Sequence, residues 1–344
     1  MAQVNLGTPS FELHPLHGVH EPTVSTPRRH PCSVRRTTSI DMTRRPGRLD
    51  PLYQEGRARD VFTDETGALH VIAETRLDAT VELISGRVAH IESEPAQSAL
   101  HGLVGGPARS GFRAAVDRVD PTLRRRGDPL YALLDDLPVA ALISGHALAA
   151  AGLLGDPSQA GYMPLADQCS GFVTGGLLMN AFDAGQTTIA TGPAAPSLEA
   201  EDDTAGWHAM PPLPVHGMRR RRRLDIYRQG DLLIDAMFRD TYVRADGVET
   251  IIHEYTITAR VREDGTVVES EAVPRVLPWL ECPGAVASAG RIVGMPLSEV
   301  RSRVRAELKG TSTCTHLNDL LRSLGDVTSL VPQLDCGIAG TFDV

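Results

Sequence analysis

The clearest hydrophobic pattern in the chain lies in its C-terminal half. Every second position from 255 to 261 is apolar, which is the period of a half-buried β-strand. Residues 263–265 (Glu-Asp-Gly) have the composition of a hairpin turn, and residues 266–273 predict the returning strand. Residues 224–238 supply one or two earlier strands. The pattern therefore predicts a small antiparallel sheet.

Helical periodicity follows this sheet. Pro283 suits the first position of a short helix that reaches residue 292. Two amphipathic helices come next, and a glycine ends each of them. Their apolar positions are Leu297, Val300, Val304 and Leu308 before Gly310, and Leu317, Leu320, Leu321 and Leu324 before Gly325. Because such helices bury one face of a sheet, we expect an α+β layer.

The N-terminal half repeats this order weakly. The string R-R-T-T-S-I-D-M from Arg35 matches R-R-R-R-R-L-D-I from Arg219, so that Asp41 aligns with Asp225. Residues 72–95 and 251–274 each hold two alternating runs around a turn glycine. We therefore predict an internal duplication: two pseudo-symmetric units, each a small antiparallel sheet covered on one face by helices, paired within the chain like a homodimer with one inactive site.

Composition sets the domain boundaries. Residues 1–34 are rich in Pro, His, Ser and Thr, which predicts a mobile leader. Residues 35–184 form the first copy. Residues 185–217, rich in Gly, Pro and Ala with an acidic tract, are expected to be a linker. Residues 218–344 form the second copy.

The charge balance restricts the partners. The net charge of −9 argues against general attraction to nucleic acid or anionic membranes. The expected partner is a small-molecule substrate. The run Arg219–Arg223 is compatible with a phosphate-binding patch, but in so acidic a chain we favour a solvated lead into a strand. The single lysine, beside many arginines and alanines, suggests a bacterial source with a high-GC genome. Beyond pairing of the two copies, the chain allows a further oligomer.

The expected location is the cytoplasm. The five cysteines are odd in number and widely spread, unlike a disulfide framework. The first thirty residues lack the apolar segment of a signal peptide. The longest apolar run, residues 139–154, contains Ser144 and His146 and predicts a buried helix rather than a membrane span.

Two histidines and two cysteines begin successive elements of the second copy. They are His253 in I-I-H-E-Y, Cys282 in E-C-P-G-A, and Cys314 and His316 in T-C-T-H-L. Thiolates and imidazoles are the ligands that zinc and iron prefer. His253 is in phase with the strand's apolar face, and we expect the start of a helix to lower the pKa of the Cys282 thiol. We therefore predict His253, Cys282 and Cys314 as metal ligands, with His316 or Glu254 moving protons.

Other interpretations remain open. Each cysteine is compatible with a small buried hydrophobe, and each histidine with a hydrogen-bonded core residue. Cys314 and His316 point about 200° apart in a regular helix, so both reach one metal only if Cys314 lies in the helix cap. The first copy has Glu74, Leu103, Gly127 and Pro129 at the aligned positions, which suggests a set lost as a unit. Cys169 and Cys336, each close to an aspartate, are less favoured outer ligands.

The strings I-H-E-Y, E-C-P-G-A and T-C-T-H-L-N-D-L-L, after R-L-D-I-Y-R, resemble a bacterial family catalogued as domain of unknown function 2889. The resemblance covers residues 219–338 well and residues 35–173 weakly. It implies a site but no reaction. A more distant likeness is to iron–sulfur scaffolds of the NifU/IscU type and their layered fold, in which Cys282 and Cys314 fall on scaffold cysteines and His253 on an aspartate ligand.

Three functions follow as hypotheses. The first is a metal-dependent enzyme of unknown substrate whose mononuclear Zn or Fe centre acts as a Lewis acid, with lyase, isomerase or hydrolase chemistry. The second is an iron–sulfur cluster carrier that holds a [2Fe–2S] unit on the same residues. The third is a binding module without a metal.

Overall fold

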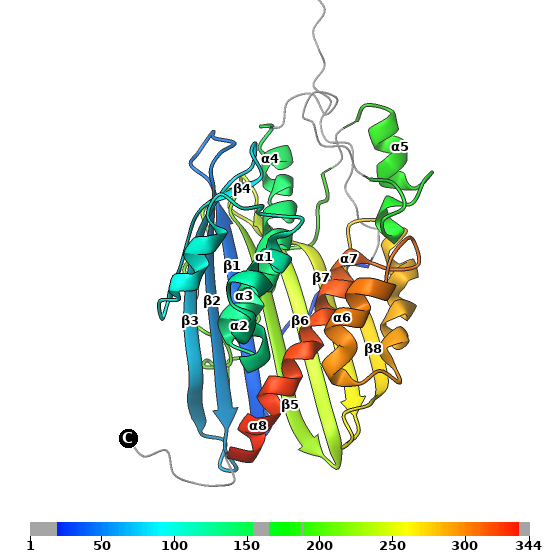
Figure 1. Cartoon of the computed structure of the whole chain (residues 1–344). Coiled ribbons are helices and arrows are strands. Elements are labelled where there is room, and N and C mark those ends of the chain that lie inside the picture. Colours follow the sequence, from blue (N-terminus) through cyan, green and yellow to red (C-terminus); the bar gives the residue numbers. More distant parts are fainter. Residues whose placement is uncertain (1–18, 154–164, 187–188, 337–344) are drawn as a thin grey trace, which may run out of the picture.

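A computed structural model describes residues 19–153, 165–186 and 189–336. Its centre is one open, antiparallel, eight-stranded sheet with the strand order β4-β3-β2-β1-β5-β6-β7-β8 (Figure 1). The strands are β1 (Ser33–Thr43), β2 (Leu52–Thr63), β3 (Leu69–Glu82), β4 (Arg87–Glu94), β5 (Met218–Gln229), β6 (Asp231–Val243), β7 (Glu249–Val261) and β8 (Val267–Val276). The fold is thus a mixture of helices and strands, as expected, but the strands join into a single sheet.

Helices cover one face of this sheet, with α1 to α3 over the N-terminal strands, α6 and α7 over the C-terminal strands, and α8 over the junction of β1 and β5 (Figure 1). The helices, with 3₁₀ helices labelled η, are η1 (Ser98–Leu103), α1 (Phe112–Val119), α2 (Pro121–Arg126), α3 (Pro129–Ile143), α4 (Gly145–Ala150), η2 (Ser170–Phe172), α5 (Leu177–Asp183), η3 (Cys282–Ile292), α6 (Leu297–Glu307), α7 (Thr315–Ser323), η4 (Leu324–Asp326) and α8 (Val327–Cys336).

The local predictions for the C-terminal half are largely confirmed. β7 and β8 contain the two predicted strands, and Gly265 makes the turn between them with a positive φ of 82°. The helix predicted to end at Gly325 instead continues through η4 into α8. A Cβ on Gly325 would lie 3.0 Å from the Cβ of Arg301 on α6. This glycine therefore permits close helix packing and does not terminate the helix.

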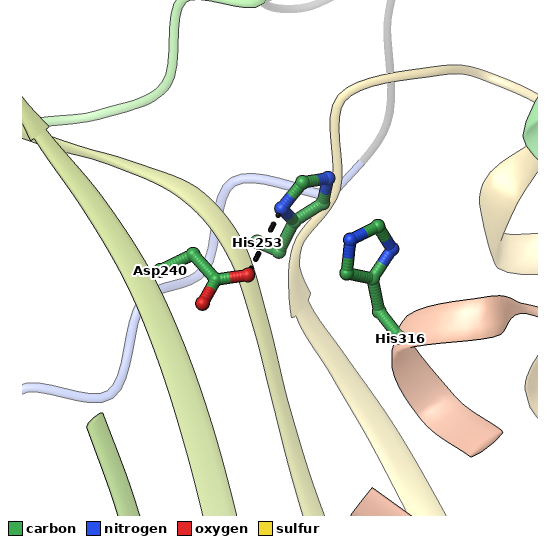
Figure 2. A group of neighbouring side chains, drawn as sticks. All are labelled: Asp240, His253 and His316. Atoms are coloured by element: carbon green, nitrogen blue, oxygen red, sulfur yellow. Dashed lines mark hydrogen bonds and ion pairs between the residues drawn. The ribbon is translucent and has the colours of Figure 1, made fainter. Parts of the chain in front are cut away.

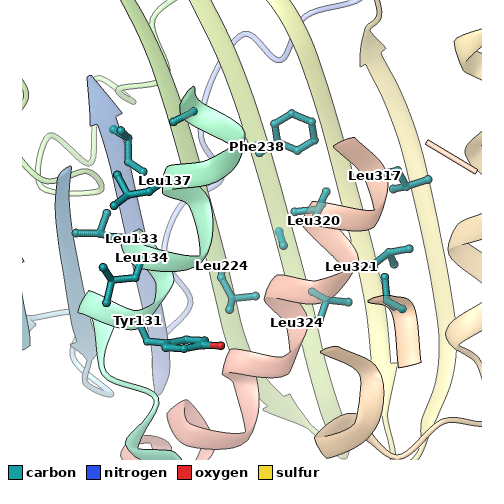
Figure 3. Packing of buried hydrophobic residues seen from close by; sticks show 14 of the residues in the cluster. Tyr131, Leu133, Leu134, Leu137, Leu224, Phe238, Leu317, Leu320, Leu321 and Leu324 are labelled. Atoms are coloured by element: carbon teal, nitrogen blue, oxygen red, sulfur yellow. The ribbon is translucent and has the colours of Figure 1, made fainter. Parts of the chain in front are cut away.

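The hydrophobic core lies between the helices and the sheet. Leucines on one side of α3 and of α7 point toward Leu224 of β5 and Phe238 of β6 (Figure 3). The helical leucines in this layer are Leu133, Leu134, Leu137, Leu317, Leu320 and Leu321, and all are buried. Burying such side chains is the main stabilising contribution to the layer.

Pro129–Ala150 is the one helical segment of the described chain that is long and apolar enough to cross a membrane by length and composition. Of its most apolar window, 67% is buried within the protein. Leu133 and Leu134 have no exposed surface. The segment is thus a core helix pair, as the sequence predicted.

The run Arg219–Arg223 forms the middle of β5 and is mostly buried. Each arginine is paired with a carboxylate: Asp41 for Arg219, Asp240 for Arg220, Glu249 for Arg221, Asp136 for Arg222, and both Asp225 and Asp235 for Arg223. The expectation of a solvated lead into a strand is therefore wrong. Both faces of β5 are covered, and neighbouring aspartates neutralise the run.

Chain segments without regular structure cover the other face of the sheet. The backbone of Thr23 accepts a hydrogen bond from Arg239 at 2.6 Å, and Trp207 donates to Thr26 at 2.8 Å. His208 bonds to Thr37 and Ser39 of β1 at 2.9 and 2.8 Å. These contacts come from the expected leader and the expected linker. Residues 1–18 of the leader lie outside the described chain.

Two four-strand runs meet where β1 pairs with β5, and they share several details. Arg36 binds Asp60 as Arg220 binds Asp240, and the register shifts directly after each aspartate. Opposite Asp60 lies Ala73, whereas His253 lies opposite Asp240. By register, Ala73 and not Glu74 therefore takes the place of His253. The internal duplication itself stays a prediction.

Candidate metal centre

Strand pairing and the start of α7 bring three donor side chains together. The ladder sets Asp240 of β6 beside His253 of β7. Both side chains lie on the helix-covered face, where the strand phase predicted His253. Cys314 caps α7 with an extended backbone (φ −121°, ψ 128°), so the helix begins beside β7 and holds His316 over His253 (Figure 2).

These residues, named here the Asp-His-His group, are close enough to hold one metal ion. One donor atom from each of Asp240, His253 and His316 lies within 4.8 Å of the others. His253 Nδ1 is 3.2 Å from Asp240 Oδ2, and the two imidazole rings stack with centroids 3.7 Å apart. Among the residues that the structure describes, no other group of three donors is this compact.

Arg220 fixes the carboxylate of this group. Its Nε and Nη2 donate to the two oxygens of Asp240 at 2.7 and 3.0 Å. Burial alone would raise the pKa of Asp240, but the charge of Arg220 and the hydrogen bonds from His253 and Arg220 outweigh burial and hold that pKa well below its usual range. The aspartate is therefore ionised and rigidly held.

Both imidazoles are mostly buried. Burial, followed by the proximity of His253, lowers the pKa of His316 to about 3, so its ring is neutral near neutral pH. The side chain of His253 is 11% exposed, and its Nδ1 lies 3.2 Å from Asp240 Oδ2, so this nitrogen and this oxygen can face one ion. Neutral imidazole is the form that binds a metal, and a carboxylate oxygen close to a ring nitrogen supplies a second ligand at the same place.

A third imidazole lies near the group. Burial, and then the charge of His253, lowers the pKa of His146 to about 3. Its Nε2 is buried without a hydrogen-bond partner in the described part of the chain. Its ring packs edge-on against Tyr242 at 4.9 Å. In the sequence, His146 stands out only as a polar residue within an apolar run, so its place near this group was not predicted.

The predicted cysteine ligands lie in a neighbouring cluster instead. Cys282 and Cys314 gather with Cys169 around Tyr255, two residues along β7 from His253. Cys314 does lie in the helix cap, yet the structure does not bring it together with His253 and His316. Burial raises the pKa of Cys282 well above its usual value, so the expected lowering at a helix start is wrong.

Glu254 lies on the opposite face from the group. It is buried, accepts hydrogen bonds from Arg239 at 2.7 Å and from the Thr23 backbone N–H at 2.8 Å, and so has partners that account for its charge. Of the other cysteines, Cys32 is exposed. The side chain of Cys336 falls outside the described residues.

An open groove of about 480 Å³ lies on the opposite face, over β2 and β3. Its charged lining residues are Arg57, Glu74, Arg76 and Glu94, and His208 also lines it. None of the donors of the Asp-His-His group lines it. The groove is therefore separate from the candidate centre.

Sequence reasoning found His253 and His316 but missed Asp240. The string F-R-D-T around Asp240 served only to align the two halves. The signal was present in the hairpin geometry, because pairing β6 with β7 through their connecting turn sets Asp240 opposite His253.

Comparisons with known proteins support part of the resemblance. Residues 218–329 match a family described as "Protein of unknown function (DUF2889)". The matched segment contains the whole Asp-His-His group, but it lacks Cys169 and His146. Comparisons with curated proteins and with solved structures find no match, and nothing in them supports a likeness to NifU/IscU-type scaffolds.

Proposed function

We propose that the protein is a metal-dependent enzyme that uses Asp240, His253 and His316 to bind a divalent ion, Zn²⁺ or Fe²⁺, and acts on a small polar molecule. The observation that carries this proposal is the approach of the three donor atoms to within 4.8 Å of one another. Two imidazoles and one carboxylate are a donor set that both ions accept while leaving coordination positions for water or substrate.

Neighbouring residues position the side chains that would bind the ion. Arg220 holds Asp240 in place, and His253 Nδ1 lies 3.2 Å from Asp240 Oδ2, so this oxygen and the unprotonated Nδ1 would ligate the same ion. The two rings lie nearly parallel, with planes 21° apart. One ring therefore turns out of the stack so that both nitrogens face one ion.

When bound, such an ion polarises a substrate oxygen or activates water, which suits hydrolysis, elimination or isomerisation. Burial of His316 favours this chemistry because a neutral ring is ready to bind without first losing a proton. Which of these reactions takes place depends on the substrate.

We infer further that the two four-strand runs are copies of one unit. The matching Arg36–Asp60 and Arg220–Asp240 pairs, with a register shift after each aspartate, support this history. Ala73 then occupies the place of His253 in the first unit, which would be the inactive half of the pair.

Metal analysis of variants tests the function. The full chain is loaded with Zn²⁺ or Fe²⁺, dialysed, and assayed for bound metal. His253→Ala and His316→Ala should lose the ion held by the group, because each removes a nitrogen ligand. His208→Ala is a matched control, since it removes a buried imidazole on the opposite face and should keep this ion.

A second comparison separates ligand loss from loss of stability. Asp240→Asn and Asp60→Asn each break a buried ion pair with an arginine. Only Asp240→Asn should also weaken metal binding, by about 10–100-fold or more. Equal metal affinity in the two variants, or full metal content in both histidine variants, would contradict the proposed centre.

A further inference from the structure

Three thiols from distant parts of the chain converge beside the Asp-His-His group. Cys169 precedes η2, Cys282 begins η3, and Cys314 caps α7. They are 6%, 5% and 3% exposed. Each thiol is close enough to the other two to affect their charge. We name these residues the three-thiol cluster.

The hydroxyl of Tyr255 points into this cluster, where it faces the sulfur of Cys314. The tyrosine is fully buried on β7, and its oxygen makes no hydrogen bond of favourable geometry to any residue that the structure describes. Burial, followed by the thiols of Cys314, Cys282 and Cys169, raises its pKa. A thiol is a weak partner for a buried hydroxyl, and an ion or ligand in the cluster would satisfy it better.

The backbone around the cluster is fixed at close range. Ser170 donates its N–H to Thr313 O at 2.9 Å and its hydroxyl to Cys282 O at 3.3 Å, which ties all three segments together. A Cβ on Gly171 would come 2.8 Å from the sulfur of Cys282. The glycine is therefore required for the segment carrying Cys169 to approach this closely.

The start of α7 supplies the electrostatic environment that thiolates need. The backbone N–H groups of His316 and Leu317 face the sulfur of Cys314, and that of Thr315 faces the sulfur of Cys169. These are the unpaired N–H groups of the first helical turn, which favour negative charge. They would partly offset the excess negative charge that three thiolates leave after binding a divalent ion.

We propose that Cys169, Cys282 and Cys314 form a thiolate site for a single soft metal ion of the Zn²⁺ class, with the Tyr255 hydroxyl beside the ion. Thiolates select soft ions of this kind. The three sulfurs do not all lie within 4.8 Å of one another, so the ion draws them together as it binds. Each thiol gives up its proton when its sulfur ligates the ion.

This site is independent of the proposed enzymatic centre. His253 and Tyr255 follow one another on the same face of β7, and His316 and Cys314 flank the first residue of α7. The two sites therefore lie side by side but share no ligand. Cys169 lies outside the segment that matches the family, so the N-terminal half completes the site.

Cobalt titration of the full chain is the test. The protein is stripped with a chelator under anaerobic, reducing conditions and titrated with Co²⁺ as a substitute for Zn²⁺. Bound Co²⁺ should show sulfur-to-cobalt charge-transfer absorption, which ligands of nitrogen and oxygen alone do not produce. Cys169→Ala, Cys282→Ala and Cys314→Ala should each weaken or abolish the band, whereas Cys32→Ala keeps it.

A second measurement, the rate of thiol alkylation in the unsubstituted protein with and without Zn²⁺, tests the site even if a variant fails to fold. Zn²⁺ should slow alkylation of the three buried thiols, identified by peptide mass spectrometry, and leave the exposed Cys32 reactive. His253→Ala should retain the charge-transfer band, and loss of the band there would overturn the two-site proposal. Absence of both band and protection, or an iron–sulfur chromophore in the isolated protein, would overturn the single-ion site.

Discussion

At the scale of single residues, the buried polar groups of this protein fall into two classes: those whose hydrogen-bonding capacity is fully used, and those that have some left. Asp240 is held by Arg220 and still offers an oxygen to His253, whereas Asp60 is held by Arg36 and faces only Ala73. A residue that is fully paired supports the fold, and one with remaining capacity can bind something else. This distinction separates the Asp-His-His group from the rest of the arginine–aspartate network.

His208 gives a prediction about acid stability. Burial, followed by Arg59, Arg57 and the other nearby arginines, lowers its pKa to about 3. The unfolded chain, with a histidine pKa of about 6.5, therefore binds a proton first as the pH falls. The stability from neutral His208 is complete above pH 6.5 or so and is lost toward pH 3, at about 1.4 kcal/mol per pH unit.

Urea unfolding at several pH values between 7.5 and 4.5 measures this effect. His208→Gln should unfold with a flatter dependence of the unfolding free energy on pH than the original chain. If the two curves have the same slope, His208 is not a neutral buried base in the folded state.

At the scale of elements, hydrophobic periodicity correctly predicted the strands, turn and helix whose formation depends on the local sequence. The alternation in β7 and β8, the turn at Gly265 and the leucines of α7 were all sufficient, because the spacing of their apolar residues follows the period of a strand or a helix within a short stretch of sequence. The five arginines of β5 gave no such signal, since their burial depends on aspartates from distant strands and helices. Long-range pairing of charges leaves no periodic pattern in the sequence.

The candidate site was predictable in part for the same reason. His316 stands at the start of α7, whereas His253 lies inside β7, and the strand phase gave the face of His253. The cysteines were placed in the same site because the starts of three elements converge there. These segments do converge, but the thiols lie around Tyr255, two residues further along β7 than His253. The spacing of residues in the sequence cannot distinguish one shared site from two neighbouring ones.

Helix α3 offers a test at this scale. Leu133 is fully buried between α3 and the sheet, whereas Leu142, on the same helix, is half exposed. Leu133→Ala should destabilise the protein by about 2–5 kcal/mol through lost burial and the cavity left behind. Leu142→Ala should change stability by only about 0.5 kcal/mol.

Denaturant unfolding of the two variants in aqueous buffer checks this. Equal effects would mean that α3 does not pack against the sheet as described, and would reopen the question of what its apolar surface contacts.

At the scale of the whole molecule, the pairing of β1 with β5 makes the two halves depend on each other. Across this junction Arg219 binds Asp41, and Arg35 binds Asp225. Arg222 receives its carboxylate from Asp136 on α3. A C-terminal half alone would therefore expose a strand edge and leave buried arginines without partners.

Expression of the halves tests this dependence. Residues 189–344 alone should aggregate or remain unfolded, and co-expression with residues 1–186 should give a soluble complex of the two fragments. Asp136→Arg in the N-terminal fragment should prevent its assembly. A monomeric 189–344 fragment that unfolds cooperatively would show that the halves are independent domains.

The central claim, that Asp240, His253 and His316 hold one metal ion, is tested most directly by nitrogen NMR of ¹⁵N-histidine-labelled protein. The resonances of His253 and His316 are assigned by their loss in His253→Ala and His316→Ala. Added Zn²⁺ should shift the Nδ1 resonance of His253 and one ring nitrogen of His316, while those of His208, bonded to Thr37 and Ser39, stay in place. Because the three-thiol cluster is proposed to bind one ion itself, zinc is added beyond two equivalents, and unchanged His253 and His316 nitrogens under these conditions would contradict the account.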